Sequence, residues 1–269
     1  MAAASVPTCL SIAGSDSGGG AGIQADLKAF ARCGVHGMTA ITALTAQNTT
    51  GVQMVTPVTP EMIVAQVDAV ASDMGVDAVK IGMLADETTI EAVVDALELI
   101  EPDAPIVVDP VMIAESGATL LDPNARAALI ERILPRANVV TPNLAEARVL
   151  SGLGEGASSE QLASAILALG PGAVVVTGGH AEDGADLLAD PDGSLRIEGP
   201  RYPAGASHGS GCTHSSALAA FLARGEELTD AARWAKEIAG EAVGNGLDTI
   251  GRGPGPVDVF GITRDNRLR

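Results

Sequence analysis

The chain alternates between short apolar runs and longer amphipathic stretches, and this alternation constrains its fold most. The apolar runs are Cys9–Ala13, Thr39–Leu44, Ala78–Ile81, Ile106–Asp109, Val139–Thr141 and Ala173–Thr177. The stretches with helical spacing are 21–33, 60–74, 86–99, 122–134, 159–169, 211–224 and 228–246. Runs that are apolar on both faces are typical of strands covered by helices on each side. We therefore predict an α/β fold in which a mainly parallel central sheet is sandwiched between helices.

Residues 185–199 follow a different pattern. Two short apolar segments flank the sequence Asp190-Pro-Asp-Gly193, which is typical of the turn in a β-hairpin. Elsewhere we find no repeat, no low-complexity linker and no change of composition. Residues 1–269 are therefore expected to form a single domain.

The balance of charges limits the possible partners. The net charge is −18, which argues against nucleic acid or an anionic membrane surface. No apolar run approaches the roughly 18 residues needed to cross a membrane, and the first residues lack the basic segment of a secretory signal. The three cysteines, Cys9, Cys33 and Cys212, are too widely spaced for a disulfide framework or a zinc motif. We expect a cytoplasmic protein.

Polar residues gather where the predicted strands end. These clusters are Gly14-Ser-Asp-Ser-Gly18, Gln47-Asn48, Asp109-Pro110, Thr141-Pro-Asn143 and Gly178-Gly-His180. In a doubly wound sheet, ligands bind beyond the carboxyl ends of the strands. The clusters are therefore expected to line one cleft.

The segment Ser207-His-Gly-Ser-Gly-Cys-Thr213 leads directly into an apolar helical run. The first N–H groups of a helix have no partner within it, and the helix dipole favours an anion there. Gly209, Ser210 and Gly211 are thus candidates for an anion hole. Cys212 would lie on the first turn, where the thiolate is favoured, so it is a candidate base or nucleophile. An inert buried thiol is the alternative.

A glycine-rich stretch, Gly18-Gly-Gly-Ala-Gly22, lies between the first strand and a helix. It matches a dinucleotide-binding motif only loosely, because no acidic residue follows about 20 positions later to bind a ribose. No Walker A motif is present, since no glycine is followed by lysine. The glycines instead suit close approach of a small ligand. Asp26 follows one turn into the helix, where it either contacts that ligand or simply belongs to the helix start.

Asp109, Asn143 and Glu146 are candidates for handling a metal ion and phosphates. Oxygen ligands of this kind suit Mg²⁺, which keeps several water molecules. Asn143 and Glu146 are also spaced as a capping box, which on spacing alone is the more common explanation. Gln47 is a lone amide after an apolar strand, equally suited to a turn or to a ligand.

Taken together and in order, these motifs resemble the ribokinase-like superfamily, and most closely the hydroxymethylpyrimidine/phosphomethylpyrimidine kinases of thiamine biosynthesis. The similarity covers nearly the whole chain. It runs through Ile12–Lys28, Thr42–Thr49, Lys80–Leu84, Val108–Met112, Thr141–Glu146, Gly178–His180 and His208–Thr213.

The resemblance implies an ATP-dependent and Mg²⁺-dependent kinase with a ribokinase-like fold. It implies that Gln47 and Asp26 hydrogen-bond an aminopyrimidine, near Gly14, with Met83 and Val111 lining the ring. The metal and phosphates would be organised by Asp109, Asn143 and Glu146. The anion hole would come from Gly209, Ser210 and Gly211, with Cys212 as the base, and the nucleotide would also contact Thr177, Gly179 and Lys236.

Two residues depart from that pattern. Thr177 stands where many bacterial members carry a lysine that touches the phosphates, and His214 replaces an apolar residue. We also expect a homodimer that binds a small-molecule substrate. A pyridoxal or pyridoxine kinase and a non-catalytic pyrimidine-binding protein remain the alternatives.

Overall fold

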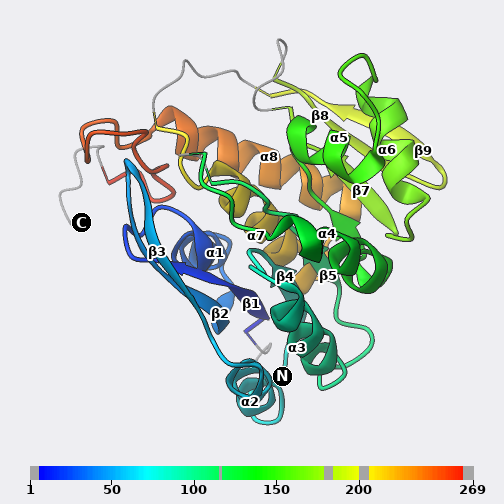
Figure 1. Cartoon of the computed structure of the whole chain (residues 1–269). Coiled ribbons are helices and arrows are strands. Elements are labelled where there is room, and N and C mark those ends of the chain that lie inside the picture. Colours follow the sequence, from blue (N-terminus) through cyan, green and yellow to red (C-terminus); the bar gives the residue numbers. More distant parts are fainter. Residues whose placement is uncertain (1–5, 115–116, 179–183, 200–205, 263–269) are drawn as a thin grey trace, which may run out of the picture.

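The computed structural model describes residues 6–114, 117–178, 184–199 and 206–262. Its centre is a nine-stranded sheet in the order β3-β2-β1-β4-β5-β6-β7-β8-β9 (Figure 1). Six strands are parallel: β1 (Thr8–Asp16), β2 (His36–Asn48), β4 (Ala78–Ile81), β5 (Ile106–Val108), β6 (Val139–Val140) and β7 (Ala173–Val176). The antiparallel strands are β3 (Gly51–Pro57), β8 (Asp186–Asp190) and β9 (Gly193–Ile197).

Helices cover both faces of the sheet. On one face lie α2 (Pro60–Ala71), α3 (Glu87–Leu97), α5 (Leu144–Ser151) and α6 (Ser159–Leu167). On the other lie α1 (Gly22–Arg32), α7 (Ser210–Ala223) and α8 (Leu228–Gly244). Neighbouring strand residues such as Val107 and Val108 enter different cores, one on each side. This two-sided burial explains the continuous apolar runs in the sequence and confirms the predicted fold class.

The predicted hairpin is confirmed, with β8 and β9 paired from Asp186 opposite Ile197 to Asp190 opposite Gly193. Two other expectations differ from the structure. Strand β3 was not predicted, because it is a mostly exposed edge strand without an apolar face. The helix expected over 122–134 is irregular. It consists of a 3₁₀ turn at Pro123–Ala125, the short α4 (Arg126–Ala128), a π turn at Leu129–Ile133 and a 3₁₀ turn at Leu134–Arg136.

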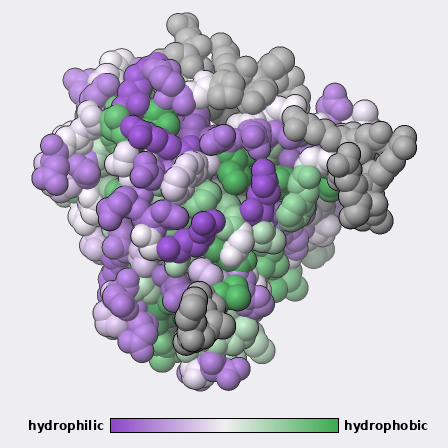
Figure 2. All heavy atoms as spheres, turned by 180° about the vertical axis from the view of Figure 1, so that it is seen from behind, coloured by the Kyte–Doolittle hydropathy of each residue, from purple (hydrophilic) through white to green (hydrophobic). Residues whose placement is uncertain are grey.

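The surface is mixed in character. Figure 2 shows the molecule from behind, with hydrophilic residues over much of this side and smaller hydrophobic patches between them. Across the described residues, none of the helices is both long enough and apolar enough to span a bilayer.

Candidate active site

A cavity of about 480 Å³ lies at the carboxyl ends of the parallel strands. The predicted residues that line it are Gly14, Gln47, Met83, Asp109, Val111, Asn143, Glu146, Thr177, Gly209, Ser210, Gly211, Cys212 and Lys236. Four of the five polar clusters at the strand ends therefore share one cleft, as expected, whereas Gly178 of the fifth cluster does not line it. Gly179 and His180 lie outside the described residues. A smaller surface hollow of about 290 Å³, beside Phe221 and Trp234, contains no residue from the strand ends.

The turn before α7 gives this side of the cavity its shape. Gly209 is the N-cap of α7 and has a φ of +87°, a left-handed conformation that favours glycine. A side chain at Gly209 would also collide with the carbonyl of Gly20, so two loops approach each other closely here. The N–H of Ser210 already donates to the carbonyl of Ser207 at 3.0 Å. Helix geometry then leaves the N–H groups of Gly211 and Cys212 to face an anion.

Cys212 lies on the first turn of α7 and is partly exposed to the cavity. Our expectation of a favoured thiolate is wrong for the free protein, because the pKa of Cys212 is raised to about 12. Burial is the largest cause, and the carboxylates of Asp109 and Asp26 add to it. The ammonium of Lys80 and the N–H of Gly22 act in the opposite direction but are outweighed. Proximity to a helix start does not by itself make this thiol acidic.

Two carboxylates face the cavity from neighbouring strand ends. Asp109 directly follows β5, and Glu146 lies in the first turn of α5. Glu146 also completes a capping box with Asn143. Its side chain accepts the N–H of Asn143 at 3.0 Å, and its own N–H donates to the Asn143 side chain at 2.9 Å. The capping interpretation is therefore confirmed. The capping box holds Glu146 in the cavity wall, so the cap and a role in the site are compatible.

The ionised forms of both carboxylates are disfavoured in the free protein. Burial and the nearby Asp109 raise the pKa of Glu146 to about 8. Burial also raises the pKa of Asp109, although Lys80 opposes this. A pair of buried carboxylates in this state would gain from a bound cation. In the described part of the chain, no group of three or more His, Cys, Asp or Glu side chains could hold a metal. A cation here would need phosphate or water as further ligands, which is how Mg²⁺ binds.

Asp26 does not line the cavity, which contradicts its expected contact with a substrate. It is fully buried, and both carboxylate oxygens are occupied. One accepts from Lys80 at 2.9 Å and from Ser216 at 2.7 Å, and the other accepts from Ser11 at 2.6 Å. Lys80 lies in turn 4.0 Å from Asp109. Asp26 thus holds a buried ammonium beneath the cavity. A lone lysine in an apolar strand was the signal for this network that sequence reasoning missed.

The expected nucleotide side contains a second ionic group. Lys236 donates to the carboxylate of Asp186 at 2.7 Å and to the carbonyl of Gly184 at 2.6 Å. The Nε2 of His214 lies 3.2 Å from the other oxygen of Asp186. Burial alone would raise the pKa of Asp186, but His214 and Lys236 lower it overall. Sequence reasoning noted His214 and Lys236 but missed Asp186, which lies in the hairpin without any motif.

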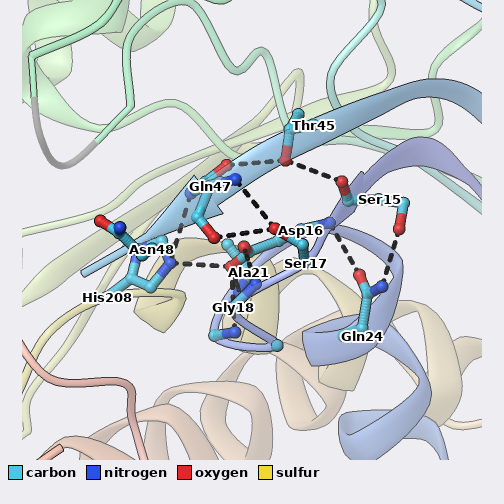
Figure 3. Close-up of polar contacts among 12 residues, drawn as sticks. Ser15, Asp16, Ser17, Gly18, Ala21, Gln24, Thr45, Gln47, Asn48 and His208 are labelled. Carbon is cyan, nitrogen blue, oxygen red and sulfur yellow. Dashed lines mark hydrogen bonds and ion pairs between the residues drawn. The ribbon is translucent and has the colours of Figure 1, made fainter. Parts of the chain in front are cut away.

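Gln47 faces the cavity from the end of β2, inside a polar cluster drawn in Figure 3. Its side chain lies beside Thr45 and His208, and His208 Nε2 is 3.0 Å from the carboxylate of Asp16. The backbone of His208 is anchored as well. Its N–H donates to the carbonyl of Gly255 at 3.2 Å, and its carbonyl accepts from Val257 at 3.1 Å. Sequence reasoning singled out Gln47 but not these neighbours.

The family model and the curated relatives agree on one family, and the solved structures include pyridoxal kinases as well. The family model described as phosphomethylpyrimidine kinase matches residues 16–258. A hydroxymethylpyrimidine/phosphomethylpyrimidine kinase of Rhizobium meliloti is 50% identical over 93% of this chain and 96% of its own length. Among solved structures, the pyridoxal kinase of Staphylococcus aureus in complex with ADP is 36% identical, with a TM-score of 0.87 over 97% of this chain and 96% of that one. The phosphomethylpyrimidine kinase of Clostridium difficile is 39% identical, with a TM-score of 0.77 over 88% and 99%.

Proposed function

This chain belongs to the phosphomethylpyrimidine kinase family, and we propose that it uses ATP to phosphorylate 4-amino-5-hydroxymethyl-2-methylpyrimidine and then the resulting monophosphate. The observation that carries this proposal is the convergence of Asp109, Glu146, the turn before α7 and Cys212 on the cavity that also contains Gln47. Binding of a pyrimidine alone would require neither the buried carboxylates nor the anion-binding helix start.

Phosphoryl transfer depends mainly on positioning and on stabilising charge. Asp109 and Glu146 would hold Mg²⁺, which when bound neutralises charge on the phosphates of ATP. The N–H groups of Gly211 and Cys212 would face the transferring phosphoryl group, where negative charge concentrates. The ammonium of Lys236 is already paired with Asp186, so it would contribute to the nucleotide side as part of a neutral pair.

Gln47 would read the pyrimidine ring, while Met83 and Val111 line it. An amide both donates and accepts, so it can pair with an exocyclic amine and the adjacent ring nitrogen at the same time. Thr177 pairs with Asn143 through a single backbone β-bridge. Its side chain is neutral, so it supplies no charge to the phosphates.

The alcohol must lose its proton as it attacks. A thiol with its pKa raised to about 12 is almost entirely protonated at neutral pH, so Cys212 would orient the bound alcohol rather than deprotonate it unless substrate binding lowers this pKa. If the Cys212 thiolate is the base during transfer, the kcat of the wild type rises with pH beyond 9. Cys212→Ser should then lose about 10²-fold or more in kcat while binding ATP and pyrimidine normally. A loss within about threefold would leave Asp109 as the next candidate base.

The activity itself is tested by incubating the purified chain with ATP, Mg²⁺ and either hydroxymethylpyrimidine or pyridoxal, and measuring ADP. We expect a higher kcat/KM for the pyrimidine and a diphosphate product in the mass spectrum. A preference for pyridoxal would favour a pyridoxal kinase, an alternative that the similarity to the Staphylococcus aureus enzyme keeps relevant. Binding without turnover would favour a non-catalytic protein.

The expected homodimer and the cytoplasmic location stay predictions. Light scattering of the purified chain would test the first, and fractionation of cells would test the second.

A further inference from the structure

The side chain of Gln47 lies between two polar groups from different parts of the chain (Figure 3). Gln47 Nε2 is 3.5 Å from His208 Nε2, and Gln47 Oε1 is 3.3 Å from Thr45 Oγ1. The backbone of Gln47 is fixed as well, because its N–H and its carbonyl each bond the Ser17 hydroxyl at 2.8 Å. The main chain of Gln47 is thus fixed, and each end of its amide has one polar neighbour.

The contact with Asp16 decides which ring nitrogen of His208 carries a hydrogen. The Asp16 carboxylate accepts N–H groups from Gly18 at 2.7 Å, Gly20 at 3.0 Å and Ala21 at 2.9 Å. Burial would raise the pKa of Asp16, but His208 and these N–H groups lower it overall, so it is ionised. A carboxylate 3.0 Å from His208 Nε2 requires a proton on that nitrogen. His208 Nε2 is then a donor, and it cannot accept an N–H from Gln47.

The Thr45 hydroxyl requires the opposite kind of group from Gln47, a hydrogen-bond donor. It donates to the carbonyl of Ser15 at 2.9 Å. A hydroxyl has one proton, so toward Gln47 it can only accept. An amide with nitrogen toward His208 and oxygen toward Thr45 therefore places donor against donor and acceptor against acceptor. Half a turn about the last side-chain bond exchanges the two atoms. The amide N–H can then donate to the Thr45 oxygen, and the amide oxygen faces the His208 N–H, which it shares with the nearer Asp16 carboxylate.

The ring of His208 is supported from one side by Gly20. It packs so closely on Gly20 that any side chain there would collide with it. Its backbone is also held on both sides by residues 255–257.

We propose that Asp16, His208 and Thr45 are positioning residues that hold the Gln47 amide with Oε1 toward His208 and Nε2 toward Thr45. One N–H and one oxygen lone pair of the amide then remain for the cavity, in a fixed order along its wall. An aminopyrimidine presents an amine beside a ring nitrogen. The fixed amide can therefore bind it in one orientation only, with its oxygen accepting from the amine and its N–H donating to the ring nitrogen. This inference rests on the proposed function, and it assigns to these three residues the selection of the aminopyrimidine ring.

Thr45→Val removes the acceptor with almost no change of shape, and Thr45→Ser keeps it. His208→Phe removes the donor at the other end of the amide. We expect Thr45→Val and His208→Phe each to raise the KM for hydroxymethylpyrimidine about 10- to 100-fold, since the partly buried Gln47 amide loses a partner. The KM for ATP should stay within about threefold, and Thr45→Ser should resemble the wild type. Pyridoxal has no ring amine, so its KM should change less.

Double variants separate positioning from a general structural role. In a Gln47→Ala background, Thr45→Val and His208→Phe should cause no further rise in the KM for the pyrimidine, because they act through the amide. His36→Phe, at an exposed histidine at the start of β2, is the matched control and should behave as the wild type. Additive effects, or equal losses for both substrates, would overturn the proposal.

Calorimetric binding of hydroxymethylpyrimidine, measured without ATP, distinguishes this proposal from the proposed function. A wild type that binds the pyrimidine but does not phosphorylate it would contradict the kinase and leave the positioning residues testable by affinity. Equal affinity in the wild type, Thr45→Val and His208→Phe would contradict the positioning role, whatever the turnover. A wild type that does not bind the pyrimidine would overturn both.

Discussion

Replacing Glu146 by glutamine should stabilise the protein at neutral pH and impair phosphoryl transfer. Glu146 is buried, and its pKa is raised from 4.5 to about 8, first by burial and then by Asp109. Glutamine has nearly the same shape, and its side-chain oxygen can still accept the N–H of Asn143 that glutamate accepts at 3.0 Å. The substitution therefore removes the titratable group while it preserves the capping box.

The magnitude follows from the two pKa values. The carboxyl group of the unfolded chain loses its proton near pH 4.5, whereas the folded protein keeps it until about pH 8. Between these values the folded state binds more protons, so stability falls as the pH rises. By pH 7 this loss is on the order of 3 kcal/mol, because each unit of pKa difference is worth about 1.4 kcal/mol. Glu146→Gln lacks the titrating group, so this loss of free energy of unfolding disappears. Because each kcal/mol is worth about 2–4 °C in a chain of this size, the melting temperature should rise by several degrees.

Urea unfolding of the two proteins between pH 5 and 8.5 would measure this difference. The gap in free energy of unfolding should widen as the pH rises, and saturating Mg²⁺ should narrow it by stabilising the wild type. Glu87→Gln is the matched control, since Glu87 is an exposed glutamate in the first turn of α3. A variant less stable than the wild type at pH 7, or a gap independent of pH, would refute the reasoning.

Three further predictions concern the site and the surface. A neutral disulfide reagent should modify Cys212 about 30- to 60-fold more slowly in the folded protein at pH 7 than in the denatured chain, because a pKa of about 12 instead of 9.0 leaves far less thiolate. Mass spectrometry would measure the rate of Cys212 modification. A rate in the folded protein equal to or faster than that in the denatured chain would mean that the helix start lowers the pKa of this thiol after all. Gln47→Ala should lower kcat/KM for hydroxymethylpyrimidine by about 10²-fold or more, and a loss below threefold would remove Gln47 from substrate recognition. The melting temperature should rise from low to molar KCl, because salt screens the repulsion of a net charge of −18, whereas a flat or falling curve would leave the composition without physical consequence.

The sheet could be predicted because its buried strands leave a strong pattern. Val107 and Val108 are both apolar because each faces a different core, and the turn at Asp190–Gly193 has residues that favour a hairpin. Strand β3 has no such pattern, since an exposed edge strand is held by pairing with β2 rather than by burial. The segment 122–134 has helical spacing, but Pro123 and Pro135 flank it, and it forms mixed short turns.

The site was predictable in position and less so in electrostatics. Strand ends placed Gln47, Asp109 and Glu146 in one cavity, because parallel strands end at one edge of the sheet. The acidity of Cys212 was not predictable, since it depends on carboxylates that reach it only through the fold. The predicted contact between Asp26 and the substrate was wrong for the same reason. The partner of Asp26, Lys80, lies 54 positions away in the sequence and is brought to it only by the fold.

The bridge between His208 and residues 255–257 also bears on how the protein is made. The N–H of Asp258 donates to the carbonyl of Ala242, so this segment passes the turn ahead of α7 and then contacts the end of α8. During translation, the sheet and α7 can assemble well before this segment leaves the ribosome. The support for His208 arrives last. A released chain that ended near residue 250 would therefore contain every strand of the sheet but lack this support for the turn, so activity should depend on residues that add nothing to the sheet.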